Sequence, residues 1–333
     1  MPLLLTQADL RPLVEDSRSF ADIFRVIQDS LLQRQGDDLG YLSWLAFPLG
    51  QKERRFNTNV LTTPIDGTSV RIFPISGGDI HPAGDGYVAL LIDNEDGHLQ
   101  AIMATDDLSP LRTSAPVGLA CTHLARPGAT TLAMIGSGIQ ARYHLRAISH
   151  GVPTLQTVRV FSPTPEHRRQ YATEMSRETR LDIEAVASAQ KAVEHADIIC
   201  IAANSRKPLM DANWVQPGAL VVSITGQGLP HDLIKRVVVP AAAGPVVLPS
   251  GWDPRPIMKA GGGRDHLTIG ATLADVIRET APARLHADDI VVYEQRGSYA
   301  WDAALLRWAY NWALEHRVGT NFQLTSTPNT KGA

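Results

Sequence analysis

The sequence has few cysteines and no C-x-x-C motif or His/Cys cluster. Its 333 residues include two cysteines, Cys121 and Cys200, which lie far apart in apolar surroundings. Such cysteines are typical of buried, reduced thiols. We therefore expect neither a disulfide nor a structural zinc site, and we predict no metal ligands.

Signals for membranes and nucleic acid are also scarce. No segment approaches the ~18 apolar residues that a membrane-spanning helix needs, and the apolar start Met1–Leu5 is too short for a signal sequence. A net charge of −3 provides no basic field for nucleic acid or anionic lipid. We expect a soluble, cytoplasmic protein that binds a small molecule and neither nucleic acid nor a membrane.

What the sequence does contain is enough apolar material for two cores, because hydrophobic residues make up 44% of it. Residues 6–35 have helical spacing. Residues 41–93 have short apolar runs broken by glycine, proline and aspartate, and 94–97 (NEDG) is typical of a hairpin turn, which predicts a largely antiparallel sheet. From residue 130, apolar strands alternate with helices, which predicts an α/β fold with a doubly wound parallel sheet.

A glycine-rich turn lies between the first of these strands and the next helix. Residues 136–141 (GSGIQA) fit the pattern G-x-G-x-x-A. The first glycine permits a tight turn, the second lets the backbone approach a pyrophosphate, and the small last residue lets helix pack on strand. The helix N-terminus offers N–H groups to phosphate. We therefore predict a dinucleotide site that includes Gly136, Ser137, Gly138, Ile139 and Gln140.

The end of the second parallel strand bears on the choice of cofactor. NAD-binding domains usually place an acidic residue there for the ribose hydroxyls, but this chain has Ser162 and Thr164, followed by Arg168 and Arg169. Hydroxyl and guanidinium groups suit a 2′-phosphate, so NADP(H) is favoured over NAD(H). The alternative is that the two arginines only coat an exposed helix.

Several segments in order along the chain resemble the ornithine cyclodeaminase/mu-crystallin family. They are MATDDLSPLRTSA (103–115), IGSGIQARYHLRA (135–147), ADIICIAANS (196–205), GSYAWDAALLRWAY (297–310) and GTNFQL (319–324). The resemblance implies a Rossmann domain at 113–295, inserted into an α+β domain made of 1–112 and 296–333. That second domain would bind substrate and form a homodimer. Members of the family carry out C–N chemistry with a bound nicotinamide.

The resemblance also implies roles for individual residues. Arg112 would meet a substrate carboxylate or the cofactor phosphates, and an arginine suits that role because its planar fork binds a carboxylate bidentately. Asp302 matches a family aspartate, although its position near the start of the last helix equally suits a cap. The positions implied to meet the cofactor are Thr113, Ala202, Ala203, Asn204, Ile224, Thr225 and Gln295.

The chain departs from the family pattern where acid–base chemistry is expected. A lysine on a strand of the first domain is replaced by Arg71, with Thr68 as the competing position, and Gly228 stands where cyclodeaminases have an aspartate. The family's Asp-Gly after the methionine is Ala104-Thr105. An arginine stays charged, whereas a lysine can exchange protons near neutral pH. These replacements favour reduction of an imine, which mainly requires positioning.

The sequence thus predicts an NAD(P)H-dependent oxidoreductase acting on the CH–NH bond of an imino acid or N-substituted amino acid. Arg112 and Arg71 would bind carboxylate, and His231 or a water would handle the proton, with His81 and Asp302 as other candidates. Two alternatives stay open. One is a cyclodeaminase-like lyase that uses bound NAD, and the other is a mu-crystallin-like cofactor-binding protein without catalysis.

Overall fold

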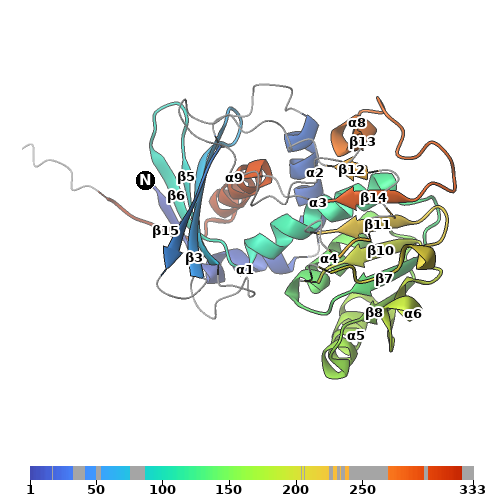
Figure 1. Cartoon of the computed structure of the whole chain (residues 1–333). Coiled ribbons are helices and arrows are strands. Elements are labelled where there is room, and N and C mark those ends of the chain that lie inside the picture. The colour runs from blue at the N-terminus through green and yellow to red at the C-terminus, as the bar shows by residue number, and fades with distance from the viewer. Residues whose placement is uncertain are drawn as a thin grey trace, which may run out of the picture. The chain divides into compact units, whose positions relative to one another are not determined.

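A computed structural model describes residues 1–16, 18–32, 42–49, 54–75, 87–203, 205, 207–224, 228–230, 233, 237–239, 269–295 and 299–324. The chain divides into two compact units, each built around one sheet (Figure 1). Unit 1 contains Met1–Ser19, Asp37–Ser109 and Asp302–Ala333, and unit 2 contains Phe20–Gly36 and Pro110–Trp301.

Unit 1 is built on a mainly antiparallel sheet, as the broken apolar runs predict. One pairing differs, because β1 runs parallel to β6. The strands are, in sheet order, β15 (Thr320–Asn321), β1 (Leu3–Leu5), β6 (Leu99–Ala104), β5 (Val88–Ile92), β4 (Gly67–Ile75), β3 (Arg54–Thr63) and β2 (Leu42–Leu49).

The two faces of this sheet have different side chains. Strand pairing aligns one row across five strands on the buried face, formed by Leu5, Met103, Ala89, Arg71 and Asn59. The adjacent row, one residue along each strand, points to the other face because side chains alternate in a strand. Its members are aliphatic and only partly buried, namely Leu4, Ile102, Leu90, Val70 and Val60.

Two helices accompany this sheet. Helix α1 (Gln7–Glu15) begins at a capping box in which Thr6 and Asp9 bond to each other's backbone N–H. Helix α9 (Tyr299–His316) is tied to the β3–β4 hairpin, because Arg307 Nε donates to Asp66 O at 3.0 Å. The buried, apolar side of α9 consists of Leu305, Leu306, Ala309 and Ala313.

Unit 2 contains a parallel sheet whose central strands are buried on both faces, which explains their continuous apolar sequences. The α/β fold class is therefore confirmed. Strand β9 and strands β12 and β13 had no clear sequence signal. In sheet order the strands are β13 (Ile269–Thr272), β12 (Val237–Val239), β14 (Val291–Glu294), β11 (Leu220–Ser223), β10 (Ile198–Ile201), β7 (Thr131–Ile135), β8 (Thr157–Phe161) and β9 (Asp182–Ala185).

The helices of unit 2 join its strands or pack on them. Helix α2 (Ser19–Leu32) comes from the N-terminal segment, which the sequence-based boundaries place in the other domain. Its Phe24 ring lies 5.2 Å from that of His150 in α4, edge to face. The helices are α2, α3 (Leu108–Leu124), α4 (Ile139–Gly151), α5 (Pro165–Thr179), α6 (Ala189–Val193), the 3₁₀ helix η2 (Ala212–Trp214) and α8 (Leu273–Ile277).

Two glycines allow α3 and α4 to approach closely. A Cβ on Gly151 would lie 2.3 Å from the carbonyl oxygen of Gly118, and a Cβ on Gly118 would lie 2.5 Å from Ala147 O and 2.3 Å from the Phe24 ring. No side chain fits at such distances without a shift of backbone. The contact therefore fixes α3, which carries Arg112 and Thr113, against α4, which follows the glycine-rich turn.

We predict that Gly118→Ala lowers the free energy of unfolding by about 1–2 kcal/mol, because overpacking outweighs the helix propensity that alanine gains. Gly138→Ala is the matched control, since a Cβ there meets no described atom within 4 Å. Urea unfolding of both variants tests this. Equal midpoints for the two variants would contradict the packing argument.

Candidate active site

The parallel sheet has a topological switch point between β7 and β10. From β7 the chain proceeds to β8 and β9 on one side, and later to β10 and β11 on the other. The loops that follow β7 and β10 therefore leave the sheet in opposite directions. Ligands of open α/β sheets bind at the carboxyl ends of the strands at such a point, which is where the glycine-rich turn begins.

Gly136 is fixed between the two neighbouring strands. Its φ of +123° is one that side chains rarely adopt, and an added Cβ would lie 2.3 Å from Ala202 O, directly after β10. Its N–H donates to Phe161 O at 2.8 Å, at the end of β8. The first glycine of the turn is thus required by the protein's own backbone.

Gly138 has the opposite surroundings. It is the N-cap of α4 with an ordinary φ of −79°, and a Cβ there would meet no described atom within 4 Å. The first N–H groups of α4 have no partner within the helix, and Ile139, at its start, is 40% exposed. This open cradle at a helix N-terminus fits the pyrophosphate of a dinucleotide. Ala141 is fully buried, as the small third residue of the pattern should be.

The next strand end brings together three residues predicted from the sequence. Ser137 Oγ lies 2.9 Å from Ser162 Oγ, and Arg168 Nη1 donates to Ser162 O at 2.7 Å. The Arg168 guanidinium also lies over the Phe161 ring at 5.7 Å. Thr164 is the N-cap of α5 and makes no side-chain capping bond. Arg169 instead pairs with Glu166 at the exposed surface, so Arg168 is the arginine at the strand end.

Gln295 connects the ends of β11 and β14 to α3. Its backbone N–H donates to Ser223 O at 2.9 Å, and its Nε2 donates to Thr113 O at 2.7 Å. The side chain is 1% exposed, and its Oε1 has no hydrogen-bond partner among the residues that the structure describes. Ile224 follows β11, and its N–H donates to Ile201 O of β10 at 3.3 Å. Ala202 and Ala203 follow β10 at the same edge.

Arg112 and its neighbour Thr113 lie on α3 and are half-buried. The hydrogen bond from Gln295 to Thr113 holds this turn of α3 to the carboxyl edge of the sheet. The sequence-predicted cofactor residues of the described part of unit 2 are therefore gathered along that edge. Asn204, Thr225, His231 and His81 lie outside the described residues.

In unit 1, Arg71 lies on the buried face of the sheet, where it forms an ion pair with Asp302 of α9. Both side chains are almost fully buried. Burial raises the pKa of Tyr87, and the nearby charge of Arg71 partly offsets that rise. Thr68 lies on the other face of the strand, where its hydroxyl donates to Asn94 Oδ1 at 2.9 Å. The geometry thus favours Arg71 over Thr68 as the polar group of the buried face.

Gly228 has a φ of +77°, and a Cβ there would lie 3.1 Å from Ile201 and 3.3 Å from Leu209. An aspartate at this position would require a strained backbone and would crowd both side chains. The absence of the cyclodeaminase aspartate is therefore matched by a local backbone that suits glycine.

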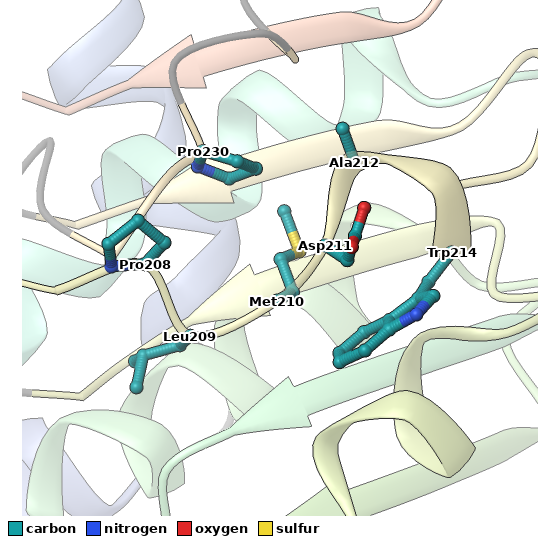
Figure 2. Close-up of a pocket in the computed structure, with 7 residues that line it drawn as sticks. All are labelled: Pro208, Leu209, Met210, Asp211, Ala212, Trp214 and Pro230. Carbon is teal, nitrogen blue, oxygen red and sulfur yellow. The ribbon is translucent and has the colours of Figure 1, made fainter.

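A pocket of about 440 Å³ lies beside η2 and contains none of the predicted site residues (Figure 2). Among the described lining residues the one charged group is Asp211, which caps η2 by accepting from the Asn213 N–H at 2.9 Å. The sequence had no motif for this pocket, and its lining offers no evident acid–base pair. The lining residues are Pro208, Leu209, Met210, Asp211, Ala212, Trp214 and Pro230.

Metal, thiol and membrane features add no further site. Within the described residues, no group of three or more His, Cys, Asp or Glu side chains could hold a metal ion. Cys121 and Cys200 are free and buried, and burial raises the pKa of Cys200 to about 12. No helix in the described part of the chain is long and apolar enough to cross a membrane.

Comparison with known proteins identifies the family. The sequence model of the ornithine cyclodeaminase/mu-crystallin family matches residues 86–317. This chain belongs to that family. Ketimine reductase mu-crystallin from Mus musculus is 25% identical over 227 residues, which cover 67% of this chain and 68% of that protein. Delta(1)-pyrroline-2-carboxylate reductase from Paracoccus denitrificans is 31% identical over 159 residues, which cover 48% and 47%.

The fold is shared with solved structures of the same kind. The structure of Delta(1)-pyrroline-2-carboxylate reductase from Thermococcus litoralis, in complex with NADH and L-proline, matches with a TM-score of 0.80. It is 24% identical in sequence, and the match covers 96% of this chain and 100% of that one. The resemblance stated from the sequence is thus confirmed for the family and the fold.

We predict that Gly138→Val in this family member weakens NAD(P)H binding by about tenfold or more, or about 1.4 kcal/mol. The branched side chain would fill the cradle while leaving an acceptable backbone. Gly138→Ala should weaken binding less than Gly138→Val, because the alanine side chain is smaller. Calorimetric titration measures the affinities, and thermal unfolding checks the fold. Wild-type affinity in a folded valine variant would exclude the cradle as the pyrophosphate site.

Proposed function

We propose that this protein is an oxidoreductase that uses NAD(P)H to reduce the C=N bond of an imino acid or ketimine, or that carries out the reverse oxidation of an N-substituted amino acid. The observation that carries the proposal is the open cradle at Gly138, at the switch point of the sheet. The family membership and the reductase names of its relatives support the same chemistry.

The residues at the sheet edge fit a nicotinamide dinucleotide. Gly138 and the α4 N-terminus would hold the pyrophosphate, and the edge around Ala202, Ile224 and Gln295 would hold the nicotinamide half. When bound there, the cofactor would supply the hydride that reduces a protonated imine to an amine. The protein's task is to bind, orient and exclude water.

NADP(H) is our proposed cofactor in preference to NAD(H). Arg168 is held at the end of β8 by Ser162 O and by the Phe161 ring, beside the hydroxyls of Ser137 and Ser162. No acidic residue stands directly at this strand end to bond ribose hydroxyls. A fixed guanidinium beside hydroxyl donors favours a 2′-phosphate by charge and hydrogen bonding.

Reduction is favoured over cyclodeamination by two features. Arg71 cannot act as a base, and its guanidinium is paired with Asp302. Gly228 supplies no carboxylate where the cyclodeaminases have one. We propose instead that Arg112 and Arg71 bind substrate carboxylate, which suits a substrate with one or two acid groups.

The test is oxidation of NADPH and NADH, followed by absorbance, with cyclic ketimines such as Δ1-pyrroline-2-carboxylate and with pairs of an amino acid and a 2-oxo acid. We predict turnover with a lower KM for NADPH. Arg112→Ala should reduce kcat/KM by about 100-fold, or about 2.7 kcal/mol, through loss of charge-assisted hydrogen bonds. The kcat/KM of Arg112→Lys should lie between those of wild type and Arg112→Ala, because lysine keeps the charge but lacks the planar guanidinium.

Two results of this test would count against the proposal. Tight cofactor binding with no turnover of any imine would favour a binding protein, and ammonia release from diamino acids without net NADH would favour a lyase. An Arg112→Ala effect below about twofold, or about 0.4 kcal/mol, would remove Arg112 as a carboxylate anchor.

We also propose that the chain forms a homodimer through the outer face of the unit 1 sheet. The aliphatic row of Leu4, Ile102, Leu90, Val70 and Val60 runs straight across five strands and is only partly buried. Leu4 is 40% exposed, and so is Val88, two residues from Leu90 on the same face of β5. A contiguous apolar face of this kind is typical of an interface, and a second copy offers the same face about a twofold axis.

We predict that Leu90→Glu converts the dimer to a monomer, because each interface would bury two carboxylates without partners. Ile65→Glu is the matched control, since Ile65 is 62% exposed at the hairpin turn of the same sheet and outside the row. Sedimentation velocity measures both. A monomeric wild type, or a Leu90→Glu dimer, would contradict this interface.

A further inference from the structure

Asn59 is an exception on the buried face of the unit 1 sheet. It lies on β3 directly opposite Arg71 of β4 in the antiparallel pair, and it is 4% exposed. Within the described part of the chain, neither its Nδ2 nor its Oδ1 has a hydrogen-bond partner. Side chains directly opposite in such a pair have Cβ atoms about 5 Å apart, so the side chains of Asn59 and Arg71 leave neighbouring strands on the same face of the sheet.

The neighbours on this face show that the exception is not general. Ser69, two residues from Arg71 on the same face of β4, donates to Leu61 O at 3.4 Å, and Arg71 is paired with Asp302. Apart from Asn59, the other residues in the row of Arg71, and the residues that Ser69 pairs with on the neighbouring strands, are aliphatic or methionine. A buried polar group without a partner destabilises the fold, whereas an apolar residue of the same shape avoids that penalty. Leucine at position 59 would therefore give a more stable sheet than asparagine.

The chemistry of a carboxamide indicates what would complete it. It presents a donor and an acceptor next to each other. An imino or amino acid presents the complementary pair, since its nitrogen carries an N–H and its adjacent carboxylate accepts. A simple carboxylate lacks the N–H and would satisfy only Nδ2.

We propose that Asn59 contacts the substrate, with Nδ2 donating to the carboxylate and Oδ1 accepting from the imine or amine N–H. This inference rests on the proposed function and assigns a residue that no sequence motif indicates. Arg71 then supplies charge to the same carboxylate, and Asp302 holds Arg71 in position. A neutral amide does not remove the proton from an iminium nitrogen, so the reducible form of the substrate is preserved.

The experiment compares L-proline with cyclopentanecarboxylate, two ligands of the same ring size in which a protonated ring nitrogen is replaced by CH2. Each is measured as an inhibitor of imine reduction and by calorimetry on the cofactor-saturated enzyme. Wild type should prefer L-proline by about tenfold or more, because a site built for a hydrogen bond rejects the analogue without it. Asn59→Leu should bind the two within about twofold of each other, and its apo form should unfold at a higher temperature than wild type.

Ser69→Ala is the matched control on the same face, and it should keep the wild-type preference. Asn59→Ala serves if the leucine variant does not fold, because alanine removes the amide without adding bulk. Retention of the preference for L-proline in either Asn59 variant would overturn the inference while leaving the proposed function intact. Failure of both ligands to bind wild type would also overturn it. The two proposals can also fail separately. If the wild type reduces no imine, but calorimetry shows that the Asn59 variants lose its preference for L-proline, the binding role of Asn59 is supported and the reductase function is refuted.

Discussion

The close approach of Gly136 to Ala202 is the contact on which the site in unit 2 depends. It holds the turn after β7 against the first residue after β10, at the topological switch point of the sheet. Only a residue without a Cβ can occupy this position, and its positive φ directs the chain into α4. Gly138 can then keep an ordinary φ of −79°, because the positive φ that the turn requires occurs two residues earlier.

The buried polar groups lie in different places in the two units. In unit 2 the polar groups gather at the carboxyl edge of the sheet, where Gln295 links two strand ends to α3. In unit 1, Arg71 and Asn59 interrupt an aliphatic face of the sheet, and Asp302 of α9 pairs with Arg71. An ion pair buried in this way is rarely a source of stability by itself. A role in binding explains it better, and the same argument applies more strongly to an amide with no partner.

The sequence was sufficient for features that depend on local patterns. Glycine spacing and strand–helix alternation identified the cradle, and the strand-end residues Ser162 and Arg168 lie where the pattern places them. Features that depend on pairing between distant segments were beyond it. The parallel pairing of β1 with β6, the ion pair of Arg71 with Asp302, and the position of Asn59 opposite Arg71 join residues with no common motif. Only strand register decided that Arg71, and not Thr68, lies on the buried face.

The central claim is that the carboxyl edge of the parallel sheet binds a nicotinamide dinucleotide. Calorimetric titration of the purified protein with NADPH and with NADH tests it most directly. The account predicts saturable binding of one dinucleotide per chain, tighter for NADPH than for NADH. Saturable binding of NADH alone would refute the assignment of Arg168 to a 2′-phosphate. No binding of either dinucleotide would contradict the whole account.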